Sequence, residues 1–143
     1  MRKRKQGGQA LVESALIMLI FLPVLFGIFD FGQFLYLHQS LSDRVRAAAR
    51  YGAVHTYTDG SDIVNVAIYN DATGSTNGAS AVLPNLQSGN SSGNGYVTAT
   101  LSGAGTDDAL ITVTITKYPY NFLWMGSTQY RTISDTEPYE IGR

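Results

Sequence analysis

A long uncharged segment near the N-terminus constrains this chain more than any other feature. Residues 14–29 carry no charge, and the apolar character resumes after Asp30. A helix needs about 20 predominantly apolar residues to cross the hydrocarbon core of a bilayer. Residues 11–37 are numerous enough if the two acids, Glu13 and Asp30, are tolerated near the ends of the segment. We therefore predict a single transmembrane helix over residues 9–37.

A basic leader, residues 1–8, sets the expected orientation of that helix. It contains four basic residues and no acidic residue. Lys and Arg resist translocation, so the N-terminus is expected to stay in the cytoplasm while the C-terminal part lies outside it. An ordinary cleaved secretory signal would need small residues just past a shorter apolar core. The residues that follow Phe29 are bulky instead, which argues against that alternative.

Charge and composition argue against several classes of function. Without residues 1–8 the chain has six basic and eleven acidic residues. We expect no nucleic-acid partner, because nucleic acids bind basic surfaces. The chain has no cysteine, so disulfides and thiolate chemistry are excluded. His38 and His55 have no acidic cluster at ligand spacing, and no acidic pair has the alternating oxygen ligands of a calcium loop. We expect no enzyme, cofactor, metal or small-molecule substrate.

Three residues within or beside the apolar segment have a possible role in assembly. A carboxylate close to lipid is costly, so Glu13 is expected to have a positive partner. Asp30 has two interpretations, a second charge-pairing group or a hydrated carboxylate among the outer headgroups. Pro23 removes one backbone hydrogen bond from the helix, and membrane helices tolerate this as a kink. The kink is either a simple bend or a weak point that lets subunits pack or be extracted.

The helical pattern continues beyond the membrane. Leu41 and Val45 follow at helical spacing, and a stripe of small residues comes next: Ala48, Ala49 and Gly52. We therefore predict that the helix extends through residues 38–55. Small side chains let another backbone approach closely. The stripe is either the seat of the chain's own folded domain or a contact with a neighbouring subunit.

The last part of the chain, residues 56–143, predicts a small α+β head with one short helix and an antiparallel sheet. Asp59 or Ser61 is expected to cap the helix, and its apolar face has four members: Ile63, Val64, Ala67 and Ile68. Residues 96–101 and 109–117 alternate apolar and polar side chains, as half-buried antiparallel strands do. A last strand is expected over residues 129–137.

Two segments of the head are predicted to be loops. Residues 87–95 are rich in Gly, Ser and Asn and predict a mobile surface loop. Residues 118–125 contain four aromatic residues. They predict either a lid over the open end of the sheet or an exposed patch that binds lipid headgroups or a neighbouring subunit.

Two motifs resemble one protein family. The first is Gly8-Gln9-Ala10-Leu11-Val12-Glu13, and the second is Arg44-Val45-Arg46-Ala47-Ala48-Ala49-Arg50-Tyr51-Gly52-Ala53. With the apolar helix that contains Pro23, these motifs resemble TadE-like proteins, the pseudopilins of tight-adherence (Flp-type) pilus systems. The resemblance covers the first 54 residues. It implies a class III signal peptide that a prepilin peptidase cuts after Gly8, which leaves Gln9 as the new N-terminus. The chain departs from the family pattern at Ser14, where an aromatic residue is common.

Residues and resemblance together predict a non-catalytic pseudopilin or minor pilin that acts in the assembly of a tight-adherence type pilus. The free amine of Gln9 in one subunit can meet Glu13 of the next, and this pairing fixes the register of the packed helices. The expected partners are membrane lipid, other pilin or pseudopilin subunits, and the prepilin peptidase. The expected location is the bacterial cytoplasmic (inner) membrane, with a single span and an extracytoplasmic head.

Two alternative functions remain open at this point. A major pilin would use the same helix to form the filament shaft, and it would then be found in the extracellular pilus. An uncleaved single-pass protein would instead hold an adhesion or receptor domain at the membrane permanently.

Overall fold

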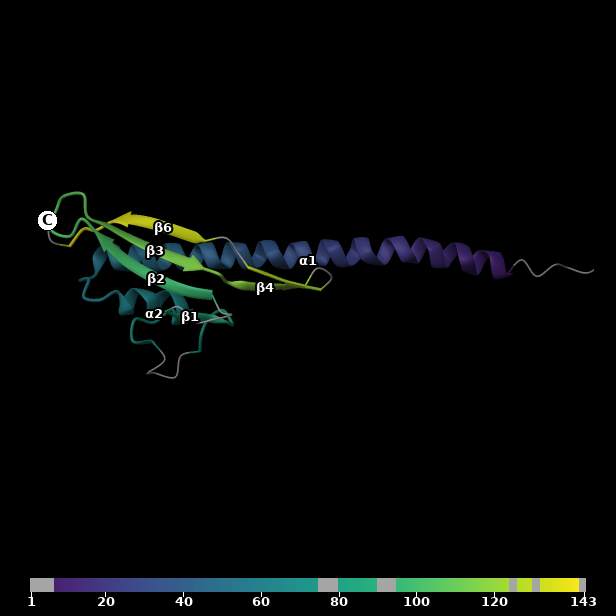
Figure 1. The fold of residues 1–143 in the computed structure, drawn as a ribbon, viewed down its shortest axis with the longest axis horizontal. Helices are drawn as coiled ribbons and strands as arrows, with labels where there is room; N and C mark the ends of the chain where they lie inside the picture. The colour runs from purple at the N-terminus through teal and green to yellow at the C-terminus, as the bar shows by residue number, and fades with distance from the viewer. Residues whose placement is uncertain (1–6, 75–79, 90–94, 124–125, 130–131, 142–143) are drawn as a thin grey trace, which may run out of the picture. The chain divides into compact units, whose positions relative to one another are not determined.

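The computed structural model describes residues 7–74, 80–89, 95–123, 126–129 and 132–141, and the statements below concern these residues. The chain forms two compact units, Met1–Tyr36 and Leu37–Arg143. Each unit is described by itself. The element order is two helices followed by six short strands, so the predicted α+β class is confirmed (Figure 1).

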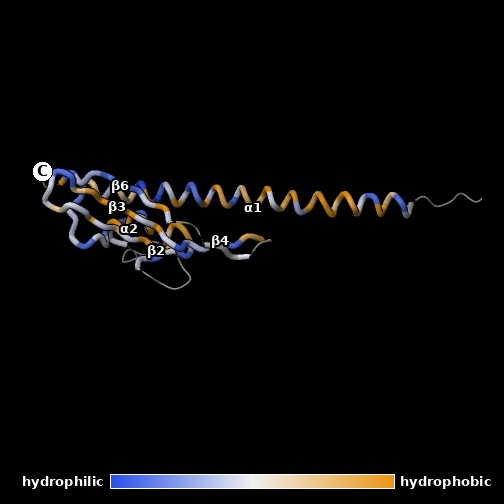
Figure 2. Tube along the Cα trace, turned by 45° about the horizontal axis from the view of Figure 1, so that its top comes forward, coloured by the Kyte–Doolittle hydropathy of each residue, from blue (hydrophilic) through white to orange (hydrophobic). Residues whose placement is uncertain are grey.

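Helix α1 (Gly7–Val54) is continuous through Pro23 and begins two residues before the predicted start at Gln9. Along its first part the large apolar side chains are exposed, and Figure 2 shows the hydrophobic residues gathered there. The helix is long and apolar enough to cross a membrane, and none of its most apolar window is buried. A core helix of a water-soluble domain would bury this surface, so α1 does not have that role over its first part.

The later turns of α1 form one wall of the core of the second unit. Leu41, Val45, Ala48 and Ala49 are at most 1% exposed and belong to one apolar cluster with residues of α2 and the sheet. At Gly52 a Cβ atom would lie 2.7 Å from Ile63 Cδ1 and 3.0 Å from Ile111 Cγ2. The absence of a side chain at Gly52 therefore lets α1 approach α2 and the sheet at the same point.

Helix α2 (Ser61–Tyr69) buries its predicted apolar face: Ile63, Val64, Ala67 and Ile68. The predicted cap was wrong, because the N-cap residue is Gly60 in a left-handed conformation and no side chain caps the helix. Asp59 instead accepts hydrogen bonds from the backbone amide of Ser61 at 2.9 Å and from its hydroxyl at 2.6 Å. The helix ends at Asn70, which is also left-handed. Asparagine is common at helix ends because it tolerates a positive φ.

The main sheet has the strand order β1–β2–β3–β6, with β1 at Leu86–Ser88, β2 at Gly95–Ser102, β3 at Leu110–Thr116 and β6 at Ile133–Pro138. The strands β2, β3 and β6 pair in antiparallel fashion, as predicted. The prediction of a purely antiparallel sheet was wrong, because β1 pairs with β2 in parallel. The sheet is mixed, with a three-residue parallel strand at one edge.

The contacts that hold β1 in place come from outside the strand. Leu83 and Leu86 are buried, and Tyr118 donates a hydrogen bond to the Pro84 carbonyl at 2.6 Å. Gly95 makes room for the Tyr118 ring, since a Cβ there would lie 2.7 Å from Tyr118 Cδ2. The expected loop over residues 87–95 was therefore partly wrong, because its first two residues end β1 and its last residue begins β2. Residues 90–94 lie outside the described part of the chain.

The two faces of the sheet differ as the alternation predicted. Val97, Ile111, Val113 and Ile115 are at most 1% exposed and face the helices. Polar residues occupy the paired positions of the opposite face, where Thr98 pairs with Thr114 and Thr100 with Thr112. This alternation fixes the register, since a slip by one residue would move the apolar set to solvent.

A separate two-stranded ribbon replaces the predicted loop at residues 118–125 and part of the predicted last strand. β4 (Pro119–Phe122) pairs in antiparallel fashion with β5 (Gly126–Gln129). The rings of Tyr120 and Phe122 meet edge to face at a centroid distance of 4.6 Å. The predicted strand over residues 129–137 is thus divided between β5 and β6. Residues 124–125 and 130–131 lie outside the described residues.

Replacement of Gly52 by valine tests the close packing of α1 in the head. The new side chain would overlap Ile63 and Ile111, so we expect the free energy of unfolding of the head to fall by about 1–3 kcal/mol. Denaturant unfolding of the full chain in detergent measures this change. Gly32→Val is the matched control, because no atom lies within 4 Å of a Cβ at Gly32. Equal stability of the Gly52→Val variant and the parent would contradict the packing described here.

Candidate functional site

The expected processing junction, Gly8-Gln9, lies in the first turns of α1. Both residues are exposed, and a Cβ at Gly8 would have no atom within 4 Å. The basic leader, residues 1–6, lies outside the described residues, while Gly7 is already helical. Glycine is less favourable than alanine in a helix by about 1 kcal/mol. Two successive glycines therefore make the first turn of α1 easy to unwind.

Glu13 lies one helical turn after Gln9 and is exposed on α1. Residues four apart lie on the same face of a helix, so the side chains of Gln9 and Glu13 lie along one side of α1. The next residue, Ser14, donates a hydrogen bond from its hydroxyl to the Ala10 carbonyl at 2.9 Å. Ser14 therefore bonds to the helix backbone, and Glu13 is the ionisable group that this turn presents to its surroundings.

Asp30 differs from Glu13 in its surroundings. It is 6% exposed, and it interacts with other groups of its own chain. Burial of a carboxylate is costly unless other groups compensate for the lost water. The role of Asp30 in charge pairing between subunits stays a prediction. Of the two acids in the apolar part of α1, Glu13 is the one left accessible to a second molecule.

The small-residue stripe lies in the second unit and not beside the processing junction. Ala48 and Ala49 are fully buried, and Gly52 contacts Ile63 and Ile111. These residues face the core of their own head. They are not accessible to a second molecule in this structure.

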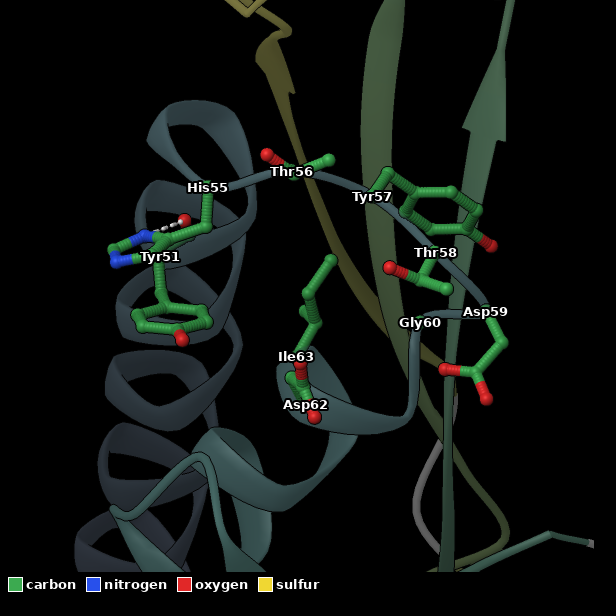
Figure 3. Close-up of a pocket in the computed structure, with 9 residues that line it drawn as sticks. All are labelled: Tyr51, His55, Thr56, Tyr57, Thr58, Asp59, Gly60, Asp62 and Ile63. Atoms are coloured by element: carbon green, nitrogen blue, oxygen red, sulfur yellow. Dashed lines mark hydrogen bonds between the residues drawn. The ribbon is translucent and has the colours of Figure 1, made fainter.

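A small recess lies where α1 ends and α2 begins (Figure 3). The rings of Tyr51 and His55 stack at a centroid distance of 3.8 Å, and His55 Nδ1 lies 2.8 Å from the Tyr51 carbonyl oxygen. Asp59 and Asp62 also line the recess, which has a volume of about 10 Å³. That is the room that one water molecule needs. The recess is too small for a substrate.

A second crevice is lined by Ser42, Val45, Arg46, Ile133, Ser134 and Asp135 and has a volume of about 80 Å³. Pockets that bind small molecules usually measure about 300–1,000 Å³. Among the described residues, no group of three or more His, Asp or Glu side chains is placed to hold a metal ion. Neither recess therefore suggests catalytic chemistry.

Several contacts that tie the head together had no signal in the sequence. The backbone amide of Glu140 donates to the Ala53 carbonyl at 2.9 Å, which joins the C-terminal segment to the end of α1. The hydroxyl of Tyr139 accepts a hydrogen bond from the Tyr57 amide at 3.1 Å. Arg44 donates to the side-chain oxygen of Asn70 at 2.9 Å. Each contact joins residues far apart in sequence, so no local pattern could have indicated it.

Part of the chain matches a known protein family. Residues 8–50 match the family model described as TadE-like protein. This confirms the resemblance for the segment that holds the expected processing junction, Glu13, the apolar helix and most of the second motif. The matched segment is under a third of the chain. No curated protein and no solved structure matches.

The turn before α2 gives a test that depends on pH. The two hydrogen bonds from Ser61 hold the pKa of Asp59 below its ordinary value of 3.8. A lowered carboxyl pKa stabilises the folded state at pH values above the ordinary pKa, and this contribution is lost as the pH falls through the lowered value. NMR titration of the Asp59 carboxyl should therefore give a midpoint below 3.8.

The matched variant for this titration is Ser61→Ala, which removes the hydroxyl donor. It should raise the pKa of Asp59 toward its ordinary value while α2 stays folded. A midpoint at or above 3.8 in the parent protein would show that the Ser61 hydrogen bonds are not formed in solution.

Proposed function

We propose that this chain, whose residues 8–50 are a TadE-like segment, is a pseudopilin or minor pilin that acts in assembly of a tight-adherence type pilus. The observation that carries this proposal is the family match over a helix whose apolar side chains have no cover within the protein. The protein acts through packing and assembly, and no reaction is turned over.

The exposed side chains of α1 require surroundings other than water. Burial of one large apolar side chain stabilises a protein by roughly 1.5–3 kcal/mol relative to exposure. More than a dozen such side chains are at least 40% exposed along the first part of α1, among them Leu11, Ile17, Leu19, Ile20 and Ile28. Their summed cost in water exceeds the whole stability of a typical domain. Lipid before assembly, and the helices of other subunits after it, would remove that cost.

The start of α1 suits processing by a prepilin peptidase. The basic leader would hold the junction at the cytoplasmic surface. Proteolysis acts most readily on backbone that can unwind locally, and Gly7 and Gly8 weaken the first turn of α1. Cleavage of the bond between Gly8 and Gln9 would release the leader and create a positively charged amine on Gln9.

That new amine is the partner that we assign to Glu13. Both charges would lie in apolar surroundings, where breaking a pair costs far more than in water. An amine on one subunit that meets the carboxylate of a neighbour would fix the two helices at one relative height. The pair would therefore contribute more to register than to net stability.

Two partners follow from this mechanism besides lipid. The prepilin peptidase would bind the leader and the first turn of α1, and other pilin or pseudopilin subunits would surround the apolar helix. The protein would lie in the inner membrane with its head outside the cytoplasm. Recovery of the chain as the bulk component of shed filaments, measured by mass spectrometry, would assign it to the shaft instead.

Replacement of Gly8 tests the processing step. The Gly8→Val variant should keep its leader, because the side chain obstructs the residue whose carbonyl is cut and stiffens the first turn. N-terminal sequencing and intact mass of the membrane-bound protein measure this. The parent should begin at Gln9. The Gly7→Val control also stiffens the first turn but leaves the residue before the cut bond unchanged, so it should be cut at the same bond, only more slowly. A parent protein that still begins at Met1 in cells with an active prepilin peptidase would contradict processing and favour the permanently anchored alternative.

Replacement of Glu13 tests the assembly step. The Glu13→Ala variant should insert into the membrane normally but assemble poorly, because loss of one member of a buried pair costs about 3–5 kcal/mol. Membrane content and sheared pili are both measured by immunoblot. Ser14→Ala is the neighbouring control and should assemble like the parent. Normal piliation with Glu13→Ala would rule out the assigned role of the carboxylate.

A further inference from the structure

The turn between strands β4 and β5 has an unusual composition. Turns are usually built from Gly, Pro, Asn, Asp or Ser. The three residues that join these two strands are instead apolar, Leu123, Trp124 and Met125, and residues 118–129 as a whole carry no charge. Of the three, Leu123 belongs to the described residues, and its side chain is 68% exposed. An apolar side chain is therefore exposed at the tip of this ribbon, where polar ones are normal.

The ribbon lies at the end of the head where α1 enters it. Ile133 lines a crevice with Ser42 and Val45, so the start of β6 lies beside the early turns of α1 within the head. The end of β3 is at the same place, because Ile115 pairs with Ile133. The chain leaves for the ribbon soon after this part of β3 and returns before Ile133, and Figure 1 shows β4 leading away from that end of the sheet. The ribbon is therefore at the Leu37 end of the head.

The opposite end of the head is acidic. The Glu140 amide donates to the Ala53 carbonyl and the Tyr139 amide to the Ala109 carbonyl, so the last turn of α1 and the loop between β2 and β3 share this end. Among the described residues, six acids lie here: Asp59, Asp62, Asp107, Asp108, Glu137 and Glu140. Anionic lipids repel such a surface. The uncharged ribbon end is therefore the end that suits a lipid surface.

The ribbon is long enough to reach that surface. The predicted membrane span ends at Leu37, which lies five residues before Ser42, or about 8 Å along a helix. A strand rises about 3.3 Å per residue, so β4 alone, with four residues, extends about 13 Å from the end of the sheet. The tip can therefore reach the level at which the apolar segment of α1 ends.

The side chains at the tip are of the kind that enters the interface of a bilayer. Phe122 is partly exposed, and its ring meets that of Tyr120 edge to face, which holds it in place. Aromatic and large apolar side chains insert shallowly between headgroups and acyl chains. A tip that is already ordered loses little conformational freedom when it inserts. The anchor brings this end of the head to lipid in every copy of the chain, before any protein partner is bound.

We propose that the tip of the β4–β5 ribbon, with Phe122 and Leu123, inserts into the outer interface of the membrane that α1 crosses. This rests on the membrane location in the proposed function and adds a second lipid contact, made by the head. Two contacts fix the orientation of the head on the bilayer, where α1 alone would leave it free to turn. Withdrawal of a subunit from the membrane into a filament must then break both contacts.

Fluorescence of the chain's single tryptophan, Trp124, tests this contact, because it follows Leu123 directly. The full chain is placed in lipid nanodiscs, one copy in each, made of phosphatidylcholine and phosphatidylglycerol with or without bromine on the acyl chains. Bromine quenches a tryptophan that touches it. We expect quenching of Trp124, and stronger quenching by bromine near the headgroups than by bromine near the chain ends. Equal emission in brominated and plain discs would overturn the proposal.

Substitution of Leu123 tests whether the tip residue drives insertion. Leu123→Asp should lower the ratio of inserted to free ribbon by about tenfold, because lipid would bury the leucine and not the aspartate. Quenching of Trp124 should fall accordingly, while Leu123→Met, which keeps an apolar side chain, should retain it. Leu110→Asp is the matched control, since Leu110 is also exposed but lies at the acidic end of the head, and it should retain quenching. Equal quenching in Leu123→Asp and the parent would overturn the role of Leu123.

Moving the reporter tests the orientation of the head. The double variant Trp124→Phe and Ala104→Trp places the single tryptophan in the exposed loop between β2 and β3. No quenching is expected there. Quenching as strong as that of Trp124 would show that the head lies on the bilayer without a preferred end, which contradicts the proposal.

Incorporation into the discs separates this proposal from the proposed function. A chain that stays out of the discs would contradict the membrane location of α1, and the tip contact with it. A chain that incorporates and gives a blue-shifted but unquenched Trp124 emission would have its tip covered by protein. That result would contradict the lipid contact alone.

Discussion

The structure depends on one helix whose exposed apolar side chains are unfavourable in water. From Leu11 to Tyr36 most large apolar side chains of α1 have no protein over them. The backbone of a helix already satisfies its own hydrogen bonds. A helix is therefore the element that can be transferred whole into lipid, because no unpaired backbone group is exposed there.

The same helix changes its role along its length. In its last turns, buried Leu41 and Val45 meet apolar residues of α2 and the sheet, and Gly52 allows the closest approach. One face of these turns is committed to the head, and the other carries Asp43, Arg46 and Arg50 to solvent. The division explains why the small-residue stripe is unavailable to neighbours while the charged face remains open.

The sequence predicted well those parts of the fold whose signal is periodic. The alternation at residues 96–101 and 109–117 gave β2 and β3 with the correct buried face, and Ile63, Val64, Ala67 and Ile68 gave the buried face of α2. It failed where position depends on distant contacts. Leu86 alone could not indicate a parallel strand. The position of β1 depends on the hydrogen bond from Tyr118 to the Pro84 carbonyl, and the Tyr118 ring fits there only because Gly95 has no side chain.

The candidate site shows the same division. Gly8, Gln9 and Glu13 were predicted from local order along the chain. The family match covers their positions, and their roles stay predictions. The different surroundings of Glu13 and Asp30 could not be predicted, since both are single acids beside apolar residues and only the folded chain shows that Asp30 is buried. The recess beside His55 was not predicted either, because it forms where separate segments meet.

The central claim, that lipid surrounds the first part of α1, is tested most directly by fractionation of cells that produce the full chain. Membranes are washed at alkaline pH without detergent, and the chain is measured in the pellet and in the supernatant. We predict that the chain stays in the pellet and is released by detergent. A folded chain found in the detergent-free supernatant would contradict the account.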